Sequence, residues 1–153
     1  MNRRTVLAAV ATATTTGLGG CTAGGGGDGD GGTASGSPST GSAPTVGSAT
    51  LDETGDCSNP NTASVAVDAA VVVTGCIQGP NGCHQPVLAN AEVDGETLEV
   101  VVTTEAREAD ACTQALVQRG YEATLTFDGD LPATVTVVHD SMGSRETVAT
   151  AER

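Results

Sequence analysis

The chain has 153 residues, with 19 Asp and Glu against six Arg and no Lys, and its only aromatic residues are one Tyr and one Phe. A surface this acidic repels nucleic-acid phosphates and anionic lipid head groups, so we expect neither as a ligand of the folded part. It suits a protein that stays soluble in concentrated salt, where self-repulsion is screened, and we expect a halophilic source.

The N-terminus has the parts of a secretory signal. Arg3 and Arg4 precede a short apolar stretch rich in Thr and Ala, which is too short to span a bilayer. The paired arginines resemble a twin-arginine export signal. We therefore expect residues 1–20 to be a signal peptide that is removed after export.

The signal ends in a sequence that resembles a lipobox, the site at which a cysteine is lipidated before cleavage. Its residues are Leu18, Gly19, Gly20 and Cys21. Five cysteines are an odd number for an exported protein, and assigning Cys21 to a lipid leaves an even set for disulfides. We expect the protein to be anchored to the outer face of the cell membrane through the lipid on Cys21, with a net charge of −15 from four Arg and 19 acids.

The next segment, residues 21–56, is expected to be a flexible linker. It is dominated by Gly, Ser, Thr and Asp and shows no apolar periodicity, so it buries too little surface to offset the entropy of ordering. The folded domain is then expected to comprise residues 57–153.

Apolar residues in this domain alternate with polar ones, which predicts strands. The expected strands cover residues 65–73, 87–93, 98–102, 121–127 and 135–137, with a short one at 146–149. Val87, Ala89, Ala91 and Val93 are expected on one face, and Asp94-Gly95 is expected to form a hairpin turn. Residues 105–120 fit either a helical turn or an edge strand. The prediction is an all-β fold, a small immunoglobulin-like antiparallel β-sandwich, with a small closed barrel as the alternative.

Four short motifs resemble those of uncharacterised twin-arginine-exported lipoproteins of halophilic archaea. They are Pro80-Asn81-Gly82-Cys83-His84, Ala111-Cys112-Thr113-Gln114, Tyr121-Glu122-Ala123-Thr124 and Leu131-Pro132. The likeness covers residues 71–140. It implies a β-sandwich with a Cys83–Cys112 disulfide, which leaves Cys57 to pair with Cys76, and it implies no activity. The sequence alone allows three connectivities, and Cys76–Cys83 is the main rival.

No residue pattern in the chain predicts catalysis or a cofactor, and we expect neither an enzyme nor a metal site. A copper site would need His84, His139, Cys83, Cys112 and Met142, but its cysteines are better used in disulfides. We expect a surface binding or structural module with an unidentified partner or ligand. The alternatives are a protease-inhibitor-like or accessory protein, which would insert residues 78–85 into a partner's cleft, and a metal-binding electron carrier.

Overall fold

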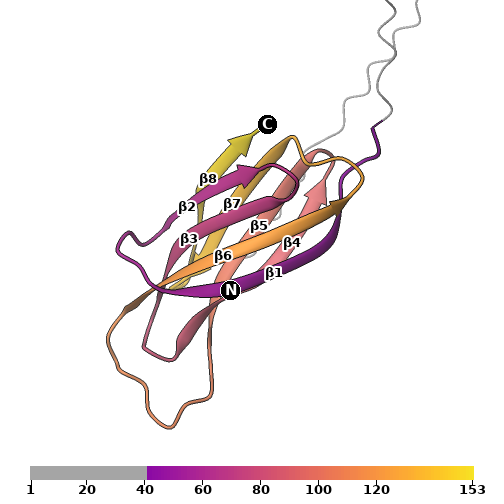
Figure 1. The fold of residues 1–153 in the computed structure, drawn as a ribbon. Helices are drawn as coiled ribbons and strands as arrows, with labels where there is room; N and C mark the ends of the chain where they lie inside the picture. Colours follow the sequence, from indigo (N-terminus) through magenta and orange to yellow (C-terminus); the bar gives the residue numbers. More distant parts are fainter. Residues whose placement is uncertain (1–40) are drawn as a thin grey trace, which may run out of the picture. The chain divides into compact units, whose positions relative to one another are not determined.

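A computed structural model describes residues 41–153, which form eight β-strands (Figure 1). The strands are β1 (Thr45–Asp56), β2 (Thr62–Val67), β3 (Val71–Gly79), β4 (His84–Asp94), β5 (Thr97–Ala106), β6 (Val117–Asp128), β7 (Thr134–Ser141) and β8 (Ser144–Glu152). No helix is present in this part of the chain. The prediction of an all-β fold is confirmed.

The strands make two four-stranded sheets that pack face to face as a sandwich. The first sheet has the order β1-β6-β3-β2 and the second the order β4-β5-β7-β8. All neighbours are antiparallel except β5 and β7, which are parallel. The parallel pair arises because the chain leaves β5, crosses to the first sheet as β6, and returns to the second sheet as β7.

Inward-facing side chains of both sheets form one core, built mainly from Val, Leu and Ala. Its fully buried members are Val71, Val73, Ile77, Leu98, Val100, Val102, Tyr121, Ala123, Leu125, Val135 and Val137. Successive members on each strand are two residues apart, or four where Gly75 lies between Val73 and Ile77, because side chains of a strand alternate between its faces. The predicted inward faces of the strands at 98–102, 121–127 and 135–137 are therefore confirmed, except that Phe127 is only partly buried.

The first strand, β1, lies inside the segment that we expected to be linker. It pairs with β6 from Thr45↔Asp128 to Asp56↔Arg119, so the folded domain begins before residue 57. Val46, Ala49 and Leu51 pack against the core. Register shifts between Val46 and Ser48 and between Glu53 and Gly55 interrupt the period of two, which hides the strand in the sequence.

Three further local predictions were wrong. The expected single strand at 65–73 is two strands, β2 and β3, joined by a turn at residues 68–70. Ala89 is exposed because it is the extra residue of a bulge between Leu88 and Asn90. The two-residue β4–β5 turn is formed by Gly95, which has a φ of 62°, and Glu96.

Residues 107–116 form neither a helical turn nor an edge strand. They make a ten-residue irregular connection between the two sheets. Val117 and Gln118 already belong to β6, which is an inner strand with neighbours on both sides.

Candidate functional site

Four of the seven connections between strands lie at one end of the sandwich, which we call the loop end. It consists of the connections at residues 57–61, 80–83, 107–116 and 142–143. The opposite end, here called the turn end, has the connections at residues 68–70, 95–96 and 129–133. The chain enters β1 at the turn end, since Thr45 pairs with Asp128 there and Asp130 N donates to Ser42 O over 3.0 Å.

Both disulfides lie at the loop end. Cys57 is bonded to Cys76, with their Cα atoms 5.9 Å apart, and Cys83 is bonded to Cys112, with their Cα atoms 5.3 Å apart. Cys83–Cys112 is the pair that the family resemblance implies, and Cys57–Cys76 is the pair that it leaves. The first holds the β1–β2 connection to β3, and the second holds the long β5–β6 connection to the β3–β4 connection.

The long connection at 107–116 is fixed at three points. Besides the Cys83–Cys112 bond, Arg107 N donates to Cys83 O over 2.9 Å and Gly82 N donates to Thr113 O over 3.0 Å. A side chain at Gly82 would overlap the Thr113 hydroxyl, so glycine permits this close approach. The connection is thus held in place at the tip of the domain, which reduces the entropy lost when it contacts another molecule.

Arg119 links β1 to the β3–β4 connection at the loop end. Its Nη1 lies 2.7 Å from Asp56 Oδ1 and 3.6 Å from Glu53 Oε1, and its Nη2 donates to Gly82 O over 3.3 Å. One guanidinium therefore links the end of β1 to the β3–β4 connection. Asp56 is largely exposed, so the linkage orders the loops more than it stabilises the fold.

The residues of the considered copper site do not come together. Cys83 and Cys112 are bonded to each other, and His84 Nδ1 lies 2.8 Å from Asn81 Oδ1, to which it donates. His139 is held elsewhere, by Tyr121. The described residues contain no cluster of three His, Cys, Asp or Glu side chains arranged to hold a metal ion.

His139 is buried at the edge of the core. It continues the inward face of Val135 and Val137, a signal that the sequence does contain. Its Nε2 lies 2.7 Å from the hydroxyl oxygen of Tyr121, and the two rings meet edge to face with centroids 5.6 Å apart. A side chain at Gly75 would overlap the Tyr121 ring, so glycine in β3 makes room for this pair.

Burial sets the protonation of both partners. It lowers the pKa of His139 to about 4 and raises the pKa of Tyr121 above its ordinary value. At neutral pH both side chains are therefore uncharged. Tyr121 is fully covered, so its hydroxyl serves the packing of the core and is not presented to a substrate.

A small pocket of about 70 Å³ opens beside His139 at the loop end. Its walls come from the three strands β3, β7 and β8 and from two connections, and they are formed by Asn61, Gln78, His139, Ser141, Met142, Ser144 and Glu146. Asn61 and Met142 have φ values of 58° and 56°, and no other non-glycine residue in the described part of the chain has a positive φ. Two sparsely populated backbone conformations thus meet at one pocket, an arrangement often associated with function.

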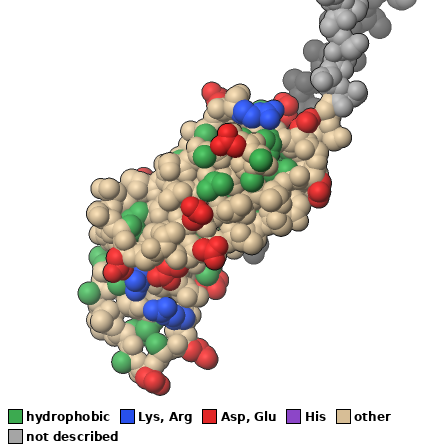
Figure 2. All heavy atoms as spheres, viewed as in Figure 1, with side chains coloured by type: hydrophobic (Ala, Val, Ile, Leu, Met, Phe, Trp, Pro, Cys, Tyr) green, Lys and Arg blue, Asp and Glu red, His purple; other side chains and the backbone are tan. Residues whose placement is uncertain are grey.

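Exposed apolar side chains also favour the loop end. Leu116 is 57% exposed and Met142 is 51% exposed, and they are the two exposed large apolar residues of the described chain. In Figure 2 this end, at the lower left, shows hydrophobic, arginine and acidic side chains close together. A mixture of apolar and charged groups on ordered loops is typical of protein-binding surfaces.

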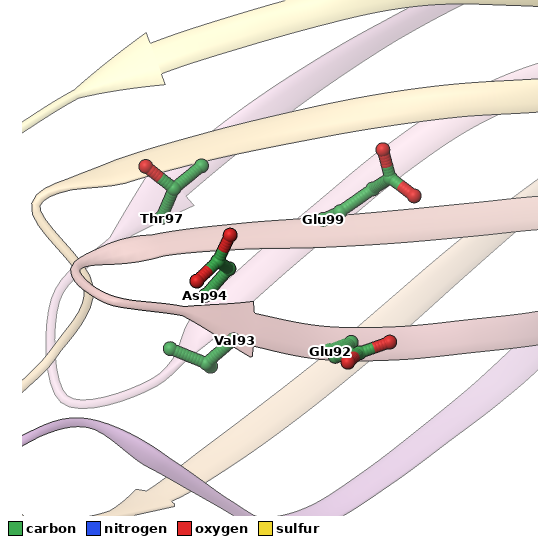
Figure 3. A pocket seen from close by; sticks show the side chains of 5 residues that line it. All are labelled: Glu92, Val93, Asp94, Thr97 and Glu99. Atoms are coloured by element: carbon green, nitrogen blue, oxygen red, sulfur yellow. The ribbon is translucent and has the colours of Figure 1, made fainter. Parts of the chain in front are cut away.

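The turn end carries a wider hollow on the β4–β5 hairpin (Figure 3). It is lined by Glu92, Val93, Asp94, Thr97 and Glu99. The three carboxylates are spread along the hairpin and do not converge on one point. Glu92 lies directly opposite Glu99, whose carboxylate is paired with Arg145 at 2.8 Å, so this hollow has the character of a solvated acidic surface.

Comparisons with known protein families, with characterised proteins and with solved structures find no match to this chain. No helix among the described residues has the length and apolar character needed to cross a membrane. The export and lipidation residues predicted from the sequence, Arg3, Arg4, Leu18, Gly19, Gly20 and Cys21, lie outside the described residues.

Proposed function

We propose that this protein is a lipid-anchored module of the outer cell surface that binds a partner through its loop end. The observation that carries the proposal is the position of the loop end. It holds both disulfides and both exposed large apolar side chains, and it lies opposite the end at which the chain enters the domain.

This placement suits a tethered binding protein. A chain anchored at Cys21 reaches the domain through Thr45, at the turn end, which leaves the loop end free to face away from the membrane. Loops that are ordered before binding lose less entropy on association, and the two disulfides and Arg119 supply that order. The domain's core residues, by contrast, explain its stability and point to no activity.

Site-specific photo-crosslinking in native membranes tests the proposal. A photoreactive amino acid would replace Leu116 at the loop end, and a matched control would replace Thr97 at the turn end. We expect a discrete protein or glycan adduct from position 116 and none from position 97. Equal labelling at both positions, or labelling only at 97, would show that the loop end is not the binding surface.

An inhibitor-like role is the second candidate, but residues 78–85 are not the segment best suited to enter a partner's cleft. Residues 78–85 do not protrude as one loop, because Gln78 and Gly79 belong to β3 and His84 and Gln85 to β4. The connection at 107–116 is longer and is pinned by Cys112, so it is the segment suited to enter a cleft. A panel of proteases assayed with the purified protein would test this role, and loss of inhibition in an Asp110→Arg, Leu116→Ser variant would assign it to this segment.

A further inference from the structure

The sandwich formed by the described residues has four edge strands, and three of them are protected against pairing with another chain. β1, β4 and β8 each contain a register shift at a bulge, and each carries at least two charged side chains. Bulges and charges are devices by which natural proteins keep an edge strand from adding a strand of a second molecule. The fourth edge strand, β2, has neither device.

β2 is a regular strand with one free edge. Among the described strands it pairs with β3 alone, in unbroken register from Thr62↔Cys76 to Val67↔Val71, and it ends the order of its sheet (Figure 1). β8 is the strand of the second sheet that comes nearest to it, but the two strands are not hydrogen-bonded. Six residues is an ordinary strand length, so β2 is long enough to accept a further strand.

The surroundings of this edge are uncharged, although the chain has a formal net charge of −13. Residues 57–67 contain no Asp, Glu or Arg. A shallow hollow beside the strand is lined by small, uncharged residues, which are Asn59, Thr62, Ala63, Ser64, Thr74 and Gly75. A second acidic molecule therefore meets neither a like charge nor a bulky side chain along this edge.

We infer that β2 pairs with β2 of a second copy of this chain, antiparallel and across a twofold axis, so that two four-stranded sheets join into one continuous sheet. The edge requires a partner strand that is uncharged, free of bulges and rich in small and β-branched residues. β2 itself is such a strand, and every copy presents it. The surface is the side of the sandwich, so the inference does not depend on the proposed role of the loop end.

The alternation of β2 fixes which residues meet. With Val65 on the twofold axis, Ala63 lies opposite Val67 of the other copy, and these three residues all pack against the core. Ser64 then lies opposite Ala66 of the other copy, and both are exposed on the outer face. Inward side chains thus meet inward ones and outward side chains meet outward ones, as an antiparallel pairing requires.

Charge and backbone conformation also favour this register. Asp68, the acid that follows β2, lies opposite Thr62 of the other copy and not opposite its own counterpart. Moving the axis by one residue, to Ser64, would bring Asn61 into the pairing. Asn61 has a φ of 58°, which is not an extended conformation, so it cannot continue the strand.

Sedimentation equilibrium of the purified chain tests the inference, with Cys21→Ser introduced to remove the lipid and its thiol. We expect a monomer–dimer equilibrium whose dissociation constant falls several-fold between dilute buffer and about 2 M sodium chloride, because salt screens the repulsion between two acidic copies.

Paired substitutions in β2 make the test specific. Ser64→Glu with Ala66→Glu places like charges directly opposite each other and should weaken association roughly tenfold. Ser64→Arg with Ala66→Glu should restore it, because opposite charges then face each other across the axis. The control, Ser48→Glu with Thr50→Glu, adds the same charge to exposed positions of β1, at the other edge of the same sheet, and should leave association unchanged.

Several results would overturn the inference. They are a chain that stays monomeric in concentrated salt, a dimer that survives Ser64→Glu with Ala66→Glu, a dimer that Ser64→Arg with Ala66→Glu does not restore, and a dimer that the β1 control weakens equally. A photoreactive amino acid in place of Ala66 in native membranes should give an adduct with twice the mass of the chain. An adduct with a different protein would show that another partner occupies this edge.

Discussion

At the scale of single residues, the burial of His139 makes the stability of the domain depend on pH. Its pKa is about 4 in the folded protein, below the ordinary value of about 6.5, so the unfolded chain binds the proton more readily. The contribution of this side chain is fully present above pH 6.5 and is lost as the pH falls toward 4. The full difference is on the order of 3 kcal/mol.

Urea unfolding at pH 7.5 and pH 5.0 measures this effect in a range where most carboxylates stay ionised. We expect a lower free energy of unfolding at pH 5.0, and we expect the difference to shrink in a His139→Gln variant. An NMR titration in which His139 protonates near pH 6.5 while the protein stays folded would contradict the prediction.

Met142 is the residue whose backbone conformation fits its side chain least well. It has a φ of 56°, followed by Gly143 at 77°, and these values are typical of a type I′ turn, which favours Asn-Gly. Met142→Asn should therefore raise the free energy of unfolding by roughly 0.5–1 kcal/mol, measured by urea denaturation. Met142→Leu is the control and should bring no gain, because leucine is no better suited to a positive φ. If Met142→Asn is destabilising, the methionine side chain contributes packing that its half-exposed position does not suggest.

At the scale of structural elements, the two disulfides should have different effects on the long connection. Replacing Cys83 and Cys112 with Ser opens a closure of 29 residues and should cost roughly 3–4 kcal/mol in the chain-entropy description. It should also release residues 107–116, so that limited proteolysis cuts there well below the unfolding temperature. The control, Cys57→Ser with Cys76→Ser, should lower stability but leave the connection protected. Equal cleavage of both variants would show that the Cys83–Cys112 bond is not the restraint that specifically holds the segment.

The strands that were predicted well are those whose alternation is uninterrupted. Tyr121, Ala123 and Leu125 in β6 and Val135 and Val137 in β7 face the core because no bulge breaks their period. β1 was missed for the opposite reason, since two register shifts and a composition of Thr, Ser and Gly make it resemble the preceding linker.

The candidate site was predictable only in part. The disulfide pairs followed from a family resemblance, and the inward position of His139 follows from its spacing to Val137. Its pairing with Tyr121 depends on how the two sheets face each other, and no local pattern contains that information. The gathering of Leu116 and Met142 at one end likewise depends on strand direction. Because β5 and β7 are parallel, the connections that follow them lie at the same end, and these connections carry Leu116 and Met142.

At the scale of the whole molecule, export, lipidation and disulfide formation make one joint prediction about mass. A chain cleaved before Cys21 and lipidated there would have a mass that begins at Cys21 plus the lipid, and only four cysteines would remain for disulfides. Intact-mass spectrometry of the protein from its native membrane, before and after reduction and alkylation, measures both features. We expect no alkylation before reduction and four alkylated thiols after it. A Cys21→Ser variant, the control, should accumulate without lipid and leave the membrane fraction. A mass that retains Met1 would contradict the anchor, and the loop end would then have to act without a tether to present it.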